Sequence, residues 1–274
     1  MQTCYRHGDR KAGVICQRCD RPICPSCMHQ ASVGFHCPEC TKSGAQKVIK
    51  ASQLVKRPIV TFSLIAINLV IYFACIGPGL QTRQVVIADY SLLGSFPPVG
   101  TPVIGVAAGE YYRLVTGGFL HANLIHVLMN MLALYQLGLL LESAFGRVRF
   151  GVVYMASMGA GALGVMLLHP HSPTVGASGA VFGLMGFAFV AMRARGIDPF
   201  STGLGGTILI NLVLTFTLSN YISVGGHVGG LIGGAVCGYL LLDFGPKHLK
   251  DDRVTLAAAT ALGAATFVAA IVVA

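Results

Sequence analysis

The stretch from residue 171 to residue 192 reads HSPTVGASGAVFGLMGFAFVAM. It passes from a short polar loop into an apolar segment long enough for a helix, and Ser178 lies at the junction among small residues. Two interpretations fit such a serine. It is a nucleophile held at the start of a helix, or it is a small residue that lets two helices pack closely.

The composition indicates an integral membrane protein. Of the 274 residues, 54% are hydrophobic and only 11% are charged, and the mean hydropathy is +0.70. Apolar runs of about 20 residues match the thickness of a bilayer. The net charge of +9 comes mainly from bases in the N-terminal segment and beside apolar runs. The expected partner is therefore the lipid bilayer, and no nucleic acid is expected.

Seven membrane segments are expected. Their predicted bounds are 58–77, 121–141, 149–168, 178–193, 203–219, 226–243 and 254–274. The fold class is therefore an all-α polytopic membrane protein. The loop between the first two segments has about forty residues, including Pro97 and Pro98, which is too long for a plain connector.

The basic residues predict the orientation of the chain. One set of segment ends carries Lys56, Arg57, Arg147, Arg149, Arg193, Arg195, Lys247, Lys250 and Arg253. The alternate loops carry only Arg83 and Arg113, both in the long first loop. The positive-inside rule then predicts a cytoplasmic N-terminus, an outer C-terminus and a multi-pass protein of the plasma membrane.

The first forty residues hold four ligand pairs with a two-residue spacer. The pairs are Cys4 with His7, Cys16 with Cys19, Cys24 with Cys27, and Cys37 with Cys40. Eight such ligands are enough for two tetrahedral Zn²⁺ sites, which would be structural, because a segment this short cannot fold on its core alone. Disulfides are the alternative, but they need an oxidising compartment, and the predicted topology argues against one.

The spacing does not say which pairs share an ion. Our interpretation is a cross-braced arrangement, in which the first pair shares an ion with the third and the second with the fourth. His29 and His36 are alternative ligands, but the four pairs suffice without them. The spacing resembles B-box-like zinc fingers. Residues 1–41 are thus predicted to form a cytoplasmic zinc-binding domain, for which a protein partner is one open role, and residues 42–57 a basic linker.

Intramembrane chemistries can be tested by elimination. A Ser/Lys dyad fails because no lysine lies between Lys56 and Lys247. An aspartyl dyad fails because no acidic residue lies between Glu142 and Asp198. The HExxH zinc motif is absent, and Ala180 breaks a GxSxG elbow.

A serine with a histidine base remains. Ser178 would be the nucleophile and His227 the general base, both at outer ends of predicted segments. The acidic residues on that side, Asp89 and Glu110, lie in the loop, so a dyad is favoured over a triad. The Ser178 N–H at a helix N-terminus would help bind the oxyanion, with the side chains of His126 and Asn130 as further donors.

Together these residues resemble the rhomboid family of intramembrane serine proteases. The resemblance covers about residues 58–274, the predicted protease membrane domain. It rests on Tyr112-Arg113, on His121 with His126 and Asn130, on Glu142 to Gly146, on Gly176 to Gly179 around Ser178, and on the GHVGG stretch of His227 and Gly230. It implies a six-helix core with a seventh C-terminal helix, a Ser–His dyad without a catalytic cofactor, and cleavage of transmembrane protein substrates.

The resemblance also assigns roles and departures. It implies that His121 organises the loop, and the zinc module resembles that of some bacterial, especially actinobacterial, members. The family usually has tryptophan where this chain has Tyr112, and many members have tyrosine at the position of Phe182, under the catalytic histidine. Phe182 keeps the aromatic face and loses the hydroxyl, so activity is still expected.

Two other functions compete with the protease. One is a catalytically inactive rhomboid-like membrane chaperone or adaptor, and the other is a zinc-gated transporter, which would need ionisable residues at the midplane. Gly226, Gly230 and Gly234 form a small-residue stripe, expected to bring the sixth helix against the fourth. Asn68 and Asn211 lack a motif and are interpreted as interhelical hydrogen-bonding residues.

Overall fold

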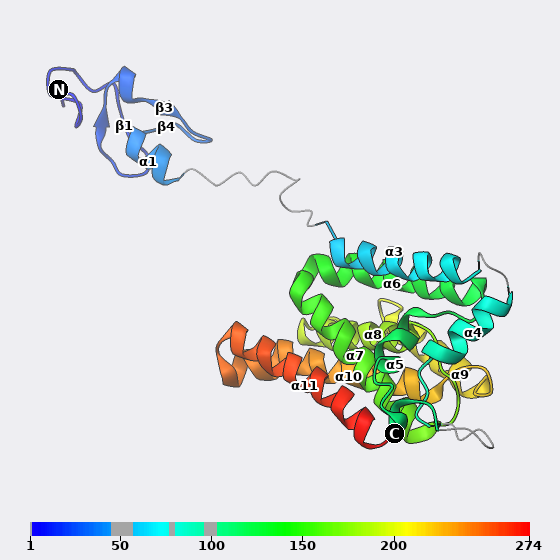
Figure 1. Ribbon diagram of the computed structural model, residues 1–274. Coiled ribbons are helices and arrows are strands. Elements are labelled where there is room, and N and C mark those ends of the chain that lie inside the picture. Colours follow the sequence, from blue (N-terminus) through cyan, green and yellow to red (C-terminus); the bar gives the residue numbers. More distant parts are fainter. Residues whose placement is uncertain (1, 45–56, 77–79, 96–102) are drawn as a thin grey trace. The chain divides into compact units, whose positions relative to one another are not determined.

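The computed structural model describes residues 2–44, 57–76, 80–95 and 103–274. The chain divides into two compact units, residues 1–55 and 56–274. Most of the predicted linker, and Pro97 with Pro98, lie outside the described residues. Figure 1 shows the described elements of both units.

The N-terminal unit is built from short elements. They are β1 (Val14–Ile15), β2 (Pro22–Ile23), the 3₁₀ turn η1 (Pro25–Cys27), β3 (His29–Gln30), β4 (Phe35–His36) and α1 (Pro38–Ser43). β1 pairs with β2 and β3 with β4, each in the antiparallel sense. The interior consists mainly of buried cysteines around Ile23, so little apolar core holds this unit together.

Each predicted membrane segment has a helix in the second unit. These helices are α3 (Ile59–Ile76), α6 (Leu124–Phe145), α7 (Arg147–Leu168), α8 (Ser178–Ala194), α9 (Leu204–Thr217), α10 (Val224–Tyr239) and α11 (Asp252–Val272). By length and hydropathy, α6, α7, α10 with its extension and α11 can cross a bilayer, and α3, α8 and α9 are shorter apolar helices. The predicted all-α polytopic membrane fold is confirmed.

The sixth helix is longer than predicted. α10 continues without a break into a π-helical stretch, η4 (Leu240–Leu249), which contains Pro246. The predicted end at residue 243 was therefore too early, and Lys247 lies within the helix instead of in a loop. There its ammonium group forms an ion pair with Asp243, one turn earlier, at 2.6 Å.

The loop after α3 is structured, as its length suggested. It contains α4 (Leu80–Tyr90), the 3₁₀ turns η2 (Val106–Ala108) and η3 (Gly117–Phe119), and the short helix α5 (Arg113–Thr116). Leu92 forms a two-stranded bridge with Thr174, through backbone hydrogen bonds of 2.8 and 2.9 Å. This bridge anchors the loop to the segment that leads into α8.

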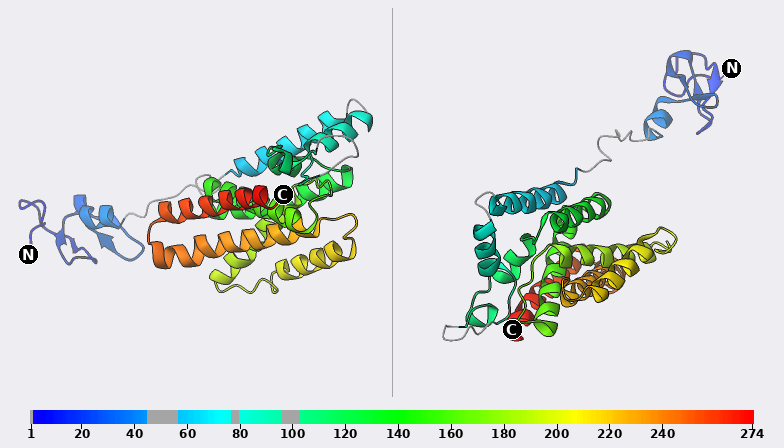
Figure 2. Two further views of the ribbon diagram at one scale, coloured as in Figure 1. Left: turned by 60° about the horizontal axis from the view of Figure 1, so that its bottom comes forward. Right: turned by 90° about the vertical axis from the view of Figure 1, so that its right-hand side faces the viewer.

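Three helices form the centre of the membrane unit. α7, α8 and α10 pack against one another, and α11 packs along α7 (Figures 1 and 2). Glycines make these contacts close. A Cβ on Gly230 would meet the carbonyl oxygen of Gly179, and one on Gly234 would meet that of Gly183. α8 and α10 thus touch backbone to backbone, as expected from the glycine stripe. Gly226 takes part through its carbonyl oxygen, to which a Cβ on Gly179 would come within 3.2 Å.

Glu142 joins α6 to α3. Its buried carboxylate accepts hydrogen bonds from the backbone N–H groups of Val60 and Thr61, at 3.0 and 2.8 Å, and from the Thr61 hydroxyl at 2.7 Å. The end of α6 therefore caps the first turn of α3, where backbone donors have no partner within the helix. Figure 1 shows α3 lying along α6.

Candidate active site

Ser178 is the first residue of α8. The chain reaches it through Gly176, whose φ of +125° favours glycine, and through the fully buried Ala177. The Gly176 N–H donates to the Gly117 carbonyl at 2.9 Å, which fixes the approach to the helix. Ser178 thus begins a helix whose free N–H groups point outward from this end.

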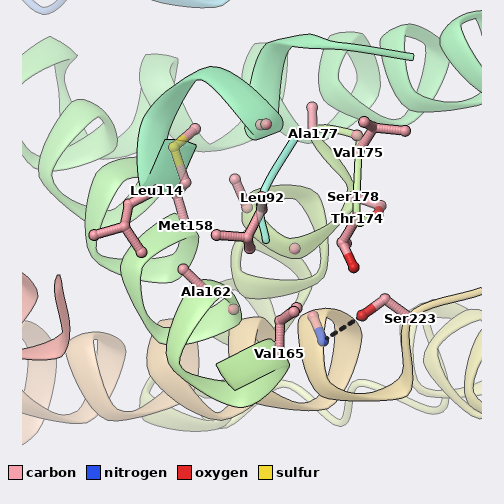
Figure 3. A pocket seen from close by; sticks show the side chains of 17 residues that line it. Leu92, Leu114, Met158, Ala162, Val165, Thr174, Val175, Ala177, Ser178 and Ser223 are labelled. Atoms are coloured by element: carbon pink, nitrogen blue, oxygen red, sulfur yellow. Dashed lines mark hydrogen bonds between the residues drawn. The ribbon is translucent and has the colours of Figure 1, made fainter. Parts of the chain in front are cut away.

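A small cavity of about 40 Å³ lies beside Ser178. Figure 3 shows Ser178 and Thr174 on one side of it, and Leu92, Leu114 and Met158 on another. A cavity of this size has room for a water molecule or a small side chain.

His227 lies in the first turn of α10 and packs against α8. Its ring stacks on that of Phe182 with a centroid distance of 4.0 Å and an interplanar angle of 19°. Ser178 and Phe182 are four residues apart and share one face of α8, so the imidazole covers the face that carries the serine. Across the described residues, no hydrogen bond joins Ser178 to His227, whose Nδ1 instead lies 2.8 Å from the Thr215 hydroxyl.

His126 reaches the same region from the first turn of α6. A Cβ built on Gly176 would lie 2.7 Å from His126 Nε2 and 3.6 Å from Ser178 Oγ, so both groups border one point. Asn130 is one turn further along α6, is 6% exposed, and donates from Nδ2 to the His126 carbonyl at 2.9 Å. A carboxamide has two N–H bonds, so one remains for a ligand.

Comparisons with known proteins identify the family of this chain. A model of the Rhomboid domain family matches residues 108–244, which is half of the chain. The chain belongs to the rhomboid family. The match begins within the loop and ends in η4, so α3 and α11 lie outside it.

Named relatives extend the match. Rhomboid protease GluP of Bacillus subtilis (strain 168) is 33% identical over 182 residues, which cover 65% of this chain and 34% of GluP. RHOMBOID-like protein 6, mitochondrial, of Arabidopsis thaliana is 34% identical over 140 residues, or 50% of this chain and 46% of that protein. Rhomboid-like protease 2 of Toxoplasma gondii is 31% identical over 226 residues, or 79% and 77%. The chain therefore spans a third to a half of the first two relatives and most of the third.

His121, a further histidine of this rhomboid domain, is packed, within the described part of the chain, without a hydrogen-bond partner for its ring nitrogens. His121 is 3% exposed, and neither ring nitrogen has a hydrogen-bond partner among the described residues. Its ring meets that of His126 edge-on, with the centroids 5.0 Å apart. This position suits a residue that supports the His126 ring.

Arg113 organises the loop of the rhomboid domain. Its buried guanidinium donates to Glu110 at 2.6 Å and to the carbonyls of Ala88 and Ser91 at 2.8 and 3.1 Å. Burial raises the pKa of Glu110, but Arg113 and the Gly105 N–H stabilise its carboxylate and lower the pKa more, below its ordinary value. The Glu110 carboxylate is thus held in an ion pair with Arg113.

The N-terminal unit gathers its ligands into two groups. Cys4, His7, Cys24 and Cys27 form one group, and Cys16, Cys19, Cys37 and Cys40 form the other. This is the cross-braced arrangement, and His29 and His36 belong to neither group. All nine cysteines are free thiols, so the described structure has no disulfide.

The spacing of the donor atoms fits a tetrahedral metal ion. In one group, Cys19 and Cys37 sulfurs lie 3.8 Å apart, and bonds of about 2.3 Å to Zn²⁺ would place two sulfurs about 3.8 Å apart. In the other, His7 Nδ1 lies 3.3 to 3.8 Å from three sulfurs. Hydrogen bonding to Cys37 and its other neighbours raises the pKa of Cys40 to about 12, so thiols this close need a cation before all ionise.

Two features were missed or misread in the sequence. Thr215, which contacts His227, has no motif around it, and a threonine in an apolar helix is ordinarily bonded to its own backbone. Asn68 and Asn211 were interpreted as interhelical, but each donates to the carbonyl four residues earlier in its own helix, at 2.8 and 2.9 Å. The interhelical interpretation was wrong for these donor bonds.

Proposed function

We propose that this rhomboid chain is an intramembrane serine endopeptidase that cleaves transmembrane segments of membrane proteins, with Ser178 as nucleophile and His227 as general base. The observation that carries the proposal is the stacking of His227 on Phe182, because it lays the imidazole over the α8 face that begins with Ser178. GluP and the Toxoplasma relative, both named as proteases, support the same class of reaction.

The proposed reaction uses these groups in two halves. Ser178 Oγ attacks the scissile carbonyl carbon while its proton passes to His227 Nε2. The C–N bond then breaks, the proton passes from His227 to the leaving amine, and the acyl group stays on Ser178. A water molecule, deprotonated by His227, attacks this ester, and Ser178 leaves with a proton from the imidazolium.

The oxyanion of each tetrahedral intermediate needs prepositioned donors. The Ser178 N–H at the α8 N-terminus is one, and the helix dipole favours negative charge there. The His126 ring and the free amide hydrogen of Asn130 are the others. The Gly176 geometry supports His126, because it brings His126 and Ser178 to one point. Asn130 is supported by its place one turn after His126 on α6.

A fluorophosphonate probe tests the proposal directly, because it labels only an activated serine. The purified protein should be labelled, and labelling should be lost in Ser178→Ala and strongly reduced in His227→Gln. An unlabelled wild-type protein that is folded by thermal melting would favour the inactive chaperone or adaptor. Proteomics of membrane proteins that accumulate in a Ser178→Ala strain would then identify substrates.

We further propose a plasma-membrane location with a cytoplasmic N-terminus and the site open to the outer face. The basic residues at alternate helix ends support it. A reporter active only outside the cytoplasm, fused after residue 274, should be active. If the outer reporter is inactive and a fluorescent reporter that works only in the cytoplasm is active at the same position, the orientation is the opposite of the one proposed.

The ions of the N-terminal unit are proposed to be Zn²⁺, two per chain, with a structural role. Seven cysteine thiolates and His7, gathered into two groups of four, favour zinc over harder cations. Residues 1–41 and 58–274 would then be separate domains, with residues 42–57 as linker. Elemental analysis of purified protein should give two zinc atoms per chain, and one or none would contradict the assignment.

A further inference from the structure

Thr215 is a buried threonine of α9 whose hydroxyl meets His227. Its side chain is 1% exposed. Its Oγ1 lies 2.7 Å from the Asn211 carbonyl oxygen and 2.8 Å from His227 Nδ1. Both distances are those of good hydrogen bonds.

A hydroxyl group has only one proton to donate, and this decides the direction of both bonds. The Asn211 carbonyl can only accept, so the Thr215 proton must point to it. The Thr215 oxygen then has only lone pairs for His227, and Nδ1 must carry the hydrogen. The opposite assignment would leave two acceptor oxygens 2.7 Å apart without a proton between them.

The assignment fixes the tautomer of the neutral imidazole. With hydrogen on Nδ1, Nε2 keeps its lone pair and can take a proton from a serine hydroxyl. We propose that Thr215 is a positioning residue that holds His227 in the Nδ1–H tautomer and so prepares Nε2 as the base. This inference rests on the proposed serine-protease function, and it adds Thr215 to the Ser178–His227 pair as an uncharged third residue.

The surroundings of His227 leave this task to Thr215. Phe182 covers a face of the ring and offers no acceptor for a ring N–H. Glu110, a candidate carboxylate on the outer side, accepts from Arg113 and from the Gly105 N–H. A neutral hydroxyl also avoids the cost of burying a carboxylate between membrane helices.

Kinetics of three variants test the role. Thr215→Val keeps the shape and removes the acceptor, and we expect kcat to fall about five- to tenfold with KM unchanged, since one neutral hydrogen bond is lost and Thr215 is not placed against substrate. Thr215→Ser should restore most of kcat. Thr207→Val is the control within the same helix, because Thr207 makes the same kind of bond to the carbonyl four residues earlier, that of Gly203, at 3.0 Å, and is exposed.

Two kinetic results would overturn the inference. One is a Thr215→Val enzyme with wild-type kcat. The other is an equal loss in Thr207→Val or in Thr215→Ser, which would show that α9 packing and not the acceptor matters. Fluorophosphonate labelling of wild-type protein separates these results from failure of the proposed function itself.

The tautomer has a readout that needs no turnover. In ¹⁵N-histidine-labelled Ser178→Ala protein, the signals lost on His227→Gln substitution belong to His227. We expect Nδ1 to show the shift of a protonated ring nitrogen and Nε2 that of an unprotonated one. An Nε2–H tautomer in this folded protein would refute the inference even if no Thr215 variant folds.

Discussion

The imidazole of His227 is held on two sides by uncharged groups. Its face lies on the ring of Phe182, and its Nδ1 meets the hydroxyl of Thr215. Both contacts orient the ring without placing a second charge beside it. At the scale of the residue, the proposed base therefore depends on shape and on one hydrogen bond, and each can be removed separately.

The flat face of Phe182 should matter more than its chemistry. Phe182→Leu keeps the apolar volume and removes the stacking surface, so we expect kcat to fall about tenfold, with a small change in thermal stability. Phe182→Tyr keeps the face and should stay within about twofold of wild type. Steady-state cleavage of a transmembrane substrate measures both. Equal activity of all three proteins would show that the stacking does not orient His227.

Asn130 should act on turnover and not on folding. If its free amide hydrogen binds the oxyanion, Asn130→Ala should lower kcat about 100-fold and leave the melting temperature nearly unchanged. Asn68→Ala is the matched control, since Asn68 is also buried and makes the same kind of bond, to Leu64. Unchanged turnover in Asn130→Ala would remove this residue from the oxyanion site.

At the scale of the element, the contact between α8 and α10 sets the distance between the two proposed catalytic residues. Gly230 and Gly234 of α10 lie against the backbone carbonyls of Gly179 and Gly183 of α8. Any side chain there must push the helices apart, and His227, one turn before Gly230, moves with α10. The same small residues that suggested mere packing of Ser178 are what the proposed chemistry requires.

A single methyl group should test this contact. Gly230→Ala places a Cβ on the Gly179 carbonyl oxygen, and relief by helix separation should cost about 1–3 kcal/mol of unfolding free energy and most of the kcat. Gly151→Ala, in α7, is the control, because nothing lies within 4 Å of a Cβ at that position. Thermal melting and probe labelling of Ser178 measure the two effects. A Gly230→Ala protein as active as Gly151→Ala would mean that the spacing of α8 and α10 is not critical.

At the scale of the whole molecule, hydropathy predicted the membrane helices and ligand spacing predicted the metal-binding unit. The end of α10 and the contact of Thr215 depend on side-chain contacts that the sequence does not show. Apolar runs located all seven predicted membrane segments, because a helix in a bilayer needs a continuous apolar stretch of sufficient length, and such a stretch is visible in the sequence. The end of α10 was missed because Lys247 looks like a loop residue, yet it pairs with Asp243 inside the helix. Thr215 could not be predicted, because its partner comes from a helix crossing that leaves no pattern in the sequence.

The two units should also differ in what holds them together. The N-terminal unit has buried cysteines in place of an apolar core, whereas the helices of the membrane unit bury two large apolar clusters. Metal removal should therefore unfold residues 1–40 and leave the membrane unit folded and reactive, because structural zinc supplies the folding free energy of such a small unit.

The measurement is limited proteolysis with and without a strong chelator, alongside probe labelling of Ser178. Cys16→Ser should reproduce the chelator's effect, and Cys75→Ser, outside both ligand groups, should not. Loss of labelling in step with proteolysis of the N-terminal unit would show instead that the membrane unit depends on the metal sites.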